Sequence, residues 1–83
     1  MGKTIDEMKS DIKAGIYTHF KGKEYHVFGV GMHSENYEDI VIYQELFGQR
    51  EIWARPLKMF CATVEKDGIE TPRFEYLREY NGE

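Results

Sequence analysis

Short segments of alternating, aromatic-rich sequence, separated by tight turns, fill the chain from Gly15 to Leu77. Successive side chains of a strand point to opposite faces of its sheet, so segments of this kind are typical of half-buried strands. Several such strands in succession predict a small, mainly β fold of five to six antiparallel strands that forms a barrel. The pattern constrains the fold, but it contains no complete catalytic or metal-binding signature.

Length and composition narrow the class of protein. The chain has 83 residues and a formal net charge of −4, which predicts one domain and argues against non-specific nucleic-acid binding. Cys61 is the single cysteine, so a disulfide framework within one chain is excluded. No apolar run approaches the roughly 20 residues of a membrane span. With no signal peptide recognised, we expect a cytoplasmic protein that does not associate with membranes.

The first residues predict a short helix. Thr4 and Glu7 have the spacing of a capping box, and Ile5, Met8 and Ile12 repeat at helical spacing. A helix this short is marginal in isolation. We therefore expect residues 1–14 to form a helix that packs on the barrel with its apolar stripe.

The barrel is expected to span residues 15–77, followed by a frayed tail at 78–83. Asp67-Gly68 is the strongest hairpin signal in the chain, and Pro72 suggests an edge strand or a bulge after it. The segment from Pro56 to Phe60 predicts a single 3₁₀ turn. Strands are expected at 16–20, 25–32, 40–47, 52–55, 62–65 and 69–77.

The second strand places two sets of residues on opposite faces if it is regular. Tyr25, Val27, Gly29 and Gly31 would share one face, and His26, Phe28, Val30 and Met32 the other. Both faces are largely apolar, which indicates a strand that is covered on both sides or strongly coiled. The two glycines would permit such a coil.

Several motifs in this order resemble the DUF1653 family of small bacterial proteins. They are GIYTHFKG at 15–22, YxVxG at 25–29, HSE at 33–35, VxYxxLxG at 41–48 and WARPLxMF at 53–60. The resemblance covers about three quarters of the chain, to roughly Phe74, and implies an SH3-like β-barrel without implying an activity. The sequence departs from the family pattern at Gly31, Asn36 and Ala62, where Ala, Thr and Glu are usual.

A candidate ligand-binding set emerges from residues near the strand ends. Trp53 and Arg55 are two residues apart and share a face, as do Val41 and Tyr43. If they meet in a groove, a stacking ring and a fixed cation would suit a planar, anionic or carboxylate-bearing ligand. Alternatively, Trp53 and Tyr43 are core residues and Arg55 pairs with Glu35 or Glu51. The full candidate set is Trp53, Arg55, Tyr43, His33, Glu35, His19 and Tyr17.

The sequence assigns no catalytic residue, metal or cofactor. His33, Ser34 and Glu35 combine a base, a nucleophile and an acid, but neighbours in an extended strand point apart, and no nucleophile elbow is present. His19, His26 and His33 are seven residues apart, unlike the closely spaced ligand pairs of structural zinc sites.

These observations favour a small non-catalytic binding module, monomeric or weakly dimeric, for an unknown small molecule or peptide. An edge strand near Pro72 would permit dimerisation by strand addition. Two alternatives remain: a small hydrolase that uses His33 or His19 as its base, and a weak nucleic-acid-binding barrel. The acidic charge balance speaks against the second.

Overall fold

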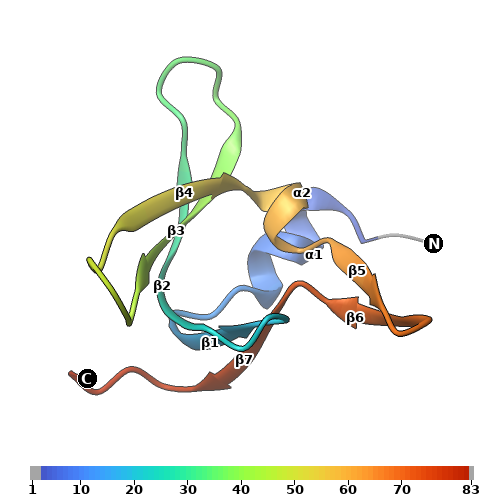
Figure 1. The fold of residues 1–83 in the computed structure, drawn as a ribbon. Coiled ribbons are helices and arrows are strands. Elements are labelled where there is room, and N and C mark those ends of the chain that lie inside the picture. Colours follow the sequence, from blue (N-terminus) through green and yellow to red (C-terminus); the bar gives the residue numbers. More distant parts are fainter. Residues whose placement is uncertain (1–2, 83) are drawn as a thin grey trace.

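The computed structural model describes residues 3–82, which form a mainly β fold of antiparallel strands with a short N-terminal helix (Figure 1). The strands β4, β3, β2, β1 and β7 form one sheet in this order, and β5 pairs with β6 in a separate hairpin. In chain order the elements are α1 (Ile5–Asp11), β1 (Gly15–His19), β2 (Glu24–Met32), β3 (Asp39–Glu45), β4 (Ile52–Pro56), α2 (Leu57–Phe60), β5 (Thr63–Lys66), β6 (Ile69–Pro72) and β7 (Phe74–Arg78).

The predicted capping box begins α1. The Thr4 hydroxyl accepts a hydrogen bond from the Glu7 amide, and the Glu7 carboxylate accepts one from the Thr4 amide. Ile5, Met8 and Ile12 all pack against the core, as their spacing predicts. None of the α1 residues is fully buried, and an ion pair of 3.3 Å between Lys9 and Asp39 also links the helix to β3. The helix ends at Asp11, before the predicted stop at Gly15.

A β-bulge in β2 corrects the predicted faces of that strand. Val27 pairs with Tyr43 of β3 and Gly29 with Ile42, so Phe28 is the extra residue. A bulge shifts the alternation by one position. Val30 consequently packs against the core on the same side as Val27, whereas the regular pattern places the two on opposite faces. Gly29, with φ +149°, occupies a backbone conformation that other residues rarely adopt.

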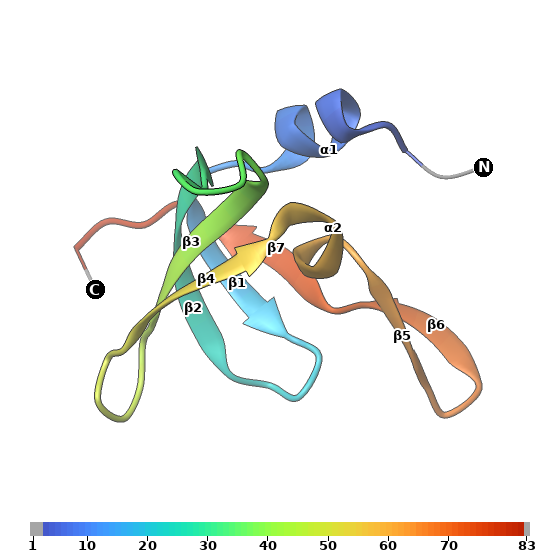
Figure 2. The ribbon, with the colours of Figure 1, turned by 90° about the horizontal axis from the view of Figure 1, so that it is seen from above.

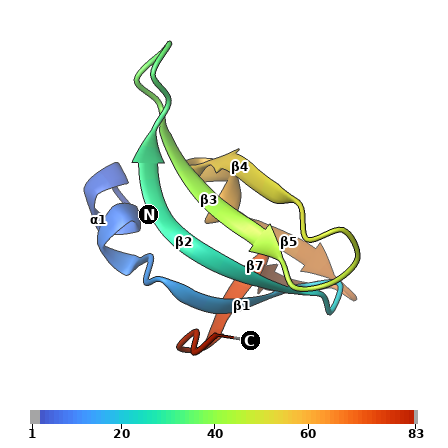
Figure 3. The ribbon, with the colours of Figure 1, turned by 90° about the vertical axis from the view of Figure 1, so that its left-hand side faces the viewer.

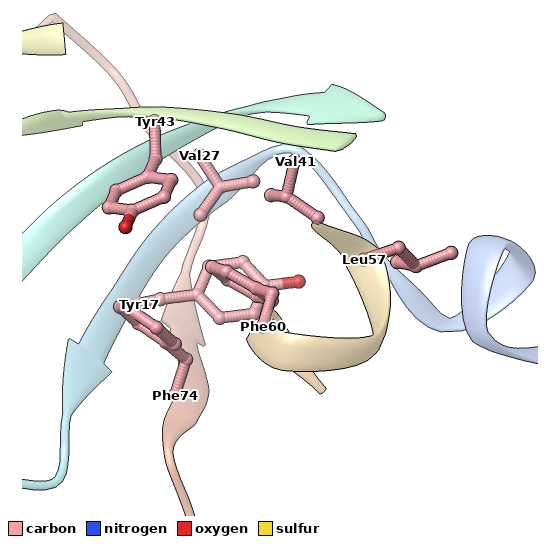
Figure 4. Packing of buried hydrophobic residues seen from close by; sticks show 7 residues of the cluster. All are labelled: Tyr17, Val27, Val41, Tyr43, Leu57, Phe60 and Phe74. Atoms are coloured by element: carbon pink, nitrogen blue, oxygen red, sulfur yellow. The ribbon is translucent and has the colours of Figure 1, made fainter. Parts of the chain in front are cut away.

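The core lies between the curved sheet and α2 (Figures 2 and 4). The Phe60 ring of α2 stacks on Phe74 of β7 at 4.2 Å and meets Tyr17 of β1 edge-on at 5.7 Å. Both Phe60 and Leu57 are almost fully buried, so the one-turn helix α2 inserts two large side chains into the fold. The buried cluster is Tyr17, Val27, Val41, Tyr43, Leu57, Phe60 and Phe74.

The C-terminal third differs from expectation in two places. The predicted 3₁₀ turn is one α-helical turn, Leu57–Phe60, and Pro56 belongs to the end of β4. The predicted strand 69–77 is interrupted at Arg73, which separates β6 from β7. The Arg73 amide donates to Ala62 O at 3.1 Å, while its carbonyl accepts from the Phe20 amide at 2.9 Å. The backbone at this residue thus joins the hairpin to the large sheet.

The predicted hairpin at Asp67-Gly68 is confirmed. Both residues have positive φ, 53° and 78°, which suits the tight turn between Lys66 and Ile69. Beyond β7, residues 79–82 have no regular structure, although the Tyr80 ring stacks on His26 at 3.6 Å. Among residues 3–82, neither helix has the length and apolar character needed to cross a membrane.

Candidate binding site on the inner face of the sheet

Strand register places most of the candidate residues on one face of the sheet. We call this the inner face, because it carries the buried residues Val41 and Tyr43. Directly paired residues in antiparallel strands point to the same side. Trp53 pairs with Tyr43 and Arg55 with Val41, so both β4 side chains lie on the inner face.

Arg55 is held by two neighbours. Its Nε donates a hydrogen bond of 3.1 Å to the Tyr43 hydroxyl, and its guanidinium carbon lies 5.9 Å from the centre of the Phe74 ring. The side chain is partly buried. Within residues 3–82, no carboxylate lies within ion-pairing distance of it, so neither Glu35 nor Glu51 is its partner. The terminal N–H groups of a guanidinium suit a carboxylate or phosphate.

His19 of β1 lies close enough to Arg55 for the charge of the arginine to act on its ring. Its ring meets Phe74, its partner on β7, edge-on at 5.0 Å. Burial lowers the pKa of His19, and the nearby positive charges of Arg73, Arg55 and Lys21 lower it further. Nδ1 accepts a hydrogen bond from the Lys21 amide at 3.2 Å, so Nε2 carries the proton of the neutral ring.

Arg73 adds a second guanidinium. Its Nε is buried, and no hydrogen-bond partner for it is found in the described part of the chain. The Arg73 side chain forms no ion pair there either. Two arginines near one neutral histidine therefore concentrate positive charge in a chain whose net charge is −4.

Tyr25 connects these groups. Its ring meets Tyr43 at 5.3 Å, Phe74 at 5.7 Å and His19 at 6.3 Å, each in an edge-on arrangement. Burial raises the pKa of Tyr25. The neighbouring groups Tyr43 and Glu45 raise this pKa further, whereas the positive charge of Arg55 lowers it. We name the group the Arg55 cluster. It consists of His19, Tyr25, Tyr43, Arg55, Arg73 and Phe74.

Trp53 borders the Arg55 cluster and is not a core residue. Trp53 is 50% exposed, whereas Tyr43 is 4% exposed. Its indole Nε1 donates to Glu45 Oε2 at 2.9 Å, and Glu45 Oε1 accepts from the Glu51 amide at 3.2 Å. Both carboxylate oxygens of Glu45 are therefore engaged away from Arg55, and the ring of Trp53 is held at the edge of β4.

His33 and Glu35 lie apart from the other candidates. They belong to the exposed loop that follows β2 and projects beyond the sheet (Figures 1 and 3). The loop joins the start of β3 at Asp39. Asp39 is four residues from Tyr43, which separates the two by about 13 Å along the strand. His33 Nδ1 accepts from the Glu35 amide at 3.1 Å, so the Glu35 carboxylate is not what orients this ring.

Tyr17 shares the inner face but belongs to the core. Its hydroxyl donates to Lys13 O at 3.0 Å and accepts from the Lys13 amide at 3.1 Å, which fixes the segment between α1 and β1. No group of three or more His, Cys, Asp or Glu side chains within residues 3–82 is placed to hold a metal ion.

Sequence reasoning missed three members of the cluster, Tyr25, Arg73 and Phe74. Tyr25 could have been found, because it precedes Val27 by two positions and so shares its face. Arg73 carried no such signal, since its position depends on the break between β6 and β7. Nothing in the linear spacing indicates that its side chain approaches His19.

The fold and the cluster define a small, mainly β protein with cationic and aromatic side chains gathered on one sheet face. The chain belongs to the DUF1653 family, described as proteins of unknown function, whose model matches residues 15–76. It is also similar to the crystal structure of a DUF1653 protein from Bordetella bronchiseptica, with 28% identity and a TM-score of 0.80. That alignment covers 90% of this chain and 99% of the other. A search of the curated proteins gave no match.

Proposed function

We propose that this protein is a non-catalytic binding module that holds a planar, anionic ligand at the Arg55 cluster. One observation carries the proposal: Arg55 and Arg73 both lie close to His19, and neither has a carboxylate partner within residues 3–82. Uncompensated, partly buried cations are costly, and a bound anion would offset this cost.

The aromatic side chains supply the second part of the proposal. Tyr25, which is only partly buried, is a partner for the flat body of a ligand, with Trp53 at the border. A carboxylate on that body would accept hydrogen bonds from the Arg55 guanidinium and from Nε2 of His19. The ligand class is therefore a small aromatic carboxylate, or a peptide that presents one.

The finer fold assignment belongs to the same proposal. The last strand, β7, returns beside β1, and a single helical turn lies between β4 and the C-terminal strands. This order supports an SH3-like, partly open barrel. Under this assignment the Arg55 cluster lies on the concave side of the sheet.

The direct experiment is a titration of ¹⁵N-labelled protein with benzoate, followed by NMR. Benzyl alcohol has the same ring without the charge and serves as the control ligand. We expect benzoate to shift the amides of His19, Tyr25 and Arg55, and benzyl alcohol to do so much less. Benzoate shifts confined to residues 33–38 would contradict the proposal.

Two variants make the test specific. Arg55→Gln removes the guanidinium while leaving a group that can still reach the Tyr43 hydroxyl, and we expect about a tenfold loss of benzoate affinity. Lys58→Gln removes the same charge from the exposed face of α2 and should bind like the parent. Equal affinities of the two variants would show that net charge alone attracts the anion. A single-stranded oligonucleotide should not bind at moderate salt.

A further inference from the structure

A largely apolar cavity lies beside Phe60 and Phe74, which both line it. It has a volume of about 510 Å³ and opens between α1, the end of α2 and β7. Its apolar wall includes Met8 of α1 and Ile12, which directly follows that helix, together with Phe60 and Tyr76. The volume falls within the range of roughly 300–1,000 Å³ that is usual for ligand sites. Met8 and Ile12 lie outside the stretch 15–76 that the family model matches.

One edge of β7 lines this cavity. The strand pairs with β1 alone, and Phe74, Glu75 and Tyr76 all contribute to the cavity wall. In Figures 2 and 4, β7 lies between β1 and α2, so its second edge faces away from β1. A strand edge of this kind presents a row of unpaired peptide groups.

The backbone geometry identifies which peptide groups are unpaired. Arg73 O accepts a hydrogen bond from the Phe20 amide at 2.9 Å and therefore points toward β1. In a trans peptide the C=O and the following N–H point in opposite directions, so the Phe74 amide points away from β1. This alternation recurs every second residue, which directs the backbone groups of Tyr76 outward as well. Within residues 3–82, no acceptor for either amide is found outside the β1–β7 pairing.

The rim of the cavity carries one uncompensated charge. Lys3 and Asp11 pair with each other across the mouth. Glu75 forms no ion pair among the described residues and is exposed. An apolar floor, an unpaired strand edge and a free carboxylate together match one kind of occupant.

We propose that an extended peptide segment of another protein, with alternate apolar side chains and Lys or Arg between them, adds to β7 as a further strand. Its apolar side chains enter the cavity beside Met8 and Ile12, and its cations lie near Glu75. Main-chain hydrogen bonds to Phe74 and Tyr76 supply the pairing, as in other strand-addition complexes. Pro72 has no N–H and limits the added strand at that end.

Pairing with β7 determines which residues of the peptide point toward the core. The side chains of Phe74 and Tyr76 point toward the core, and their peptide groups point away from β1. In an antiparallel pair, hydrogen-bonded residues share a face, so the apolar residues of the peptide must also be those whose N–H groups face β7. The probe is the capped pentapeptide Lys-Val-Lys-Val-Lys. N-methylation of both valines should abolish binding, and N-methylation of the central lysine should leave it nearly unchanged.

Amide hydrogen exchange gives the site-specific readout. In the free protein the Tyr76 amide should exchange faster than the Glu75 amide, and the probe should slow Tyr76 about tenfold or more. Glu75→Gln should weaken binding several-fold, while Glu70→Gln on the exposed β6 should not. Equal binding of the two N-methylated peptides would overturn the strand pairing. Displacement of the probe by isobutylamine would indicate that the cavity binds a small molecule. Protection of the Tyr76 amide that rises with protein concentration in the absence of peptide would indicate that a second copy of this chain pairs with β7. Either result would overturn the proposed occupant.

Discussion

Arg55 Nε donates a 3.1 Å hydrogen bond to the hydroxyl of Tyr43, a residue that is itself 4% exposed. The buried ring thus fixes a cation at the border between core and solvent. Tyr43 also touches Phe74 and Tyr25, so the orientation of Arg55 depends on the same rings that pack the fold. Positioning by a buried partner is what a binding site needs in order to present a charge without reorganisation.

Tyr43→Phe tests this positioning. The variant keeps the ring and removes the hydroxyl, so the free energy of unfolding should fall by only about 1 kcal/mol. Benzoate affinity should fall several-fold, because the guanidinium is no longer held. Tyr37→Phe removes a hydroxyl from an exposed loop residue and is the matched control. Thermal unfolding and NMR titration measure the two effects, and an unchanged affinity for Tyr43→Phe would refute the positioning role.

Trp53 and Phe60 should differ in their effect on stability. Phe60 is 2% exposed and stacks on Phe74, so Phe60→Ala should cost about 3–5 kcal/mol. Trp53 is 50% exposed, and Trp53→Ala should cost only about 1–2 kcal/mol. Chemical denaturation gives both values. A loss at Trp53 as large as that at Phe60 would mean that this ring is part of the core.

Two glycines provide an internally controlled comparison. Gly15 and Gly29 both have φ +149°, so alanine is strained at either position. At Gly15 a Cβ would lie 2.8 Å from Arg78 O and from Tyr76 Cε1, whereas at Gly29 nothing lies within 4 Å. Gly15→Ala should therefore be the more destabilising by about 1–3 kcal/mol in denaturation. Equal losses would argue against this close approach of β1 and β7.

The pH dependence of stability should contain a contribution from His19. Burial and the neighbouring charges of Arg73, Arg55 and Lys21 hold its pKa below the usual value of 6.5. The unfolded chain therefore takes up a proton at this residue before the folded chain does. The resulting stabilisation is present above pH 6.5 and is lost as the pH falls toward the folded pKa. His19→Gln should remove this part of the dependence of the unfolding free energy on pH. The same pH dependence in the variant and the parent would exclude a contribution from His19.

Much of the fold could be predicted because its signals are local. The capping box of Thr4 and Glu7, the Asp67-Gly68 turn and the alternation of Val41 and Tyr43 each act over a few residues. The bulge at Phe28 could not be placed, because it depends on how β2 pairs with β3. It reversed the predicted face of every later residue in that strand.

The candidate site was predicted in part for the same reason. Arg55 and Trp53 share a face by simple alternation, and their register with β3 brings them to Tyr43. His33 shares with them only a position near a strand end, and the loop between β2 and β3 carries it away from Tyr43. Arg73 joins the cluster through the change of sheets between β6 and β7, which no local pattern encodes.

An NMR titration of the His19 ring with pH, in the presence and absence of benzoate, tests the central claim most directly. Without ligand, the pKa of His19 should lie below 6.5. Saturating benzoate should raise it, because a carboxylate beside the ring favours the imidazolium, and benzyl alcohol should leave it in place. A His19 pKa that benzoate does not change would contradict an anion site at the Arg55 cluster.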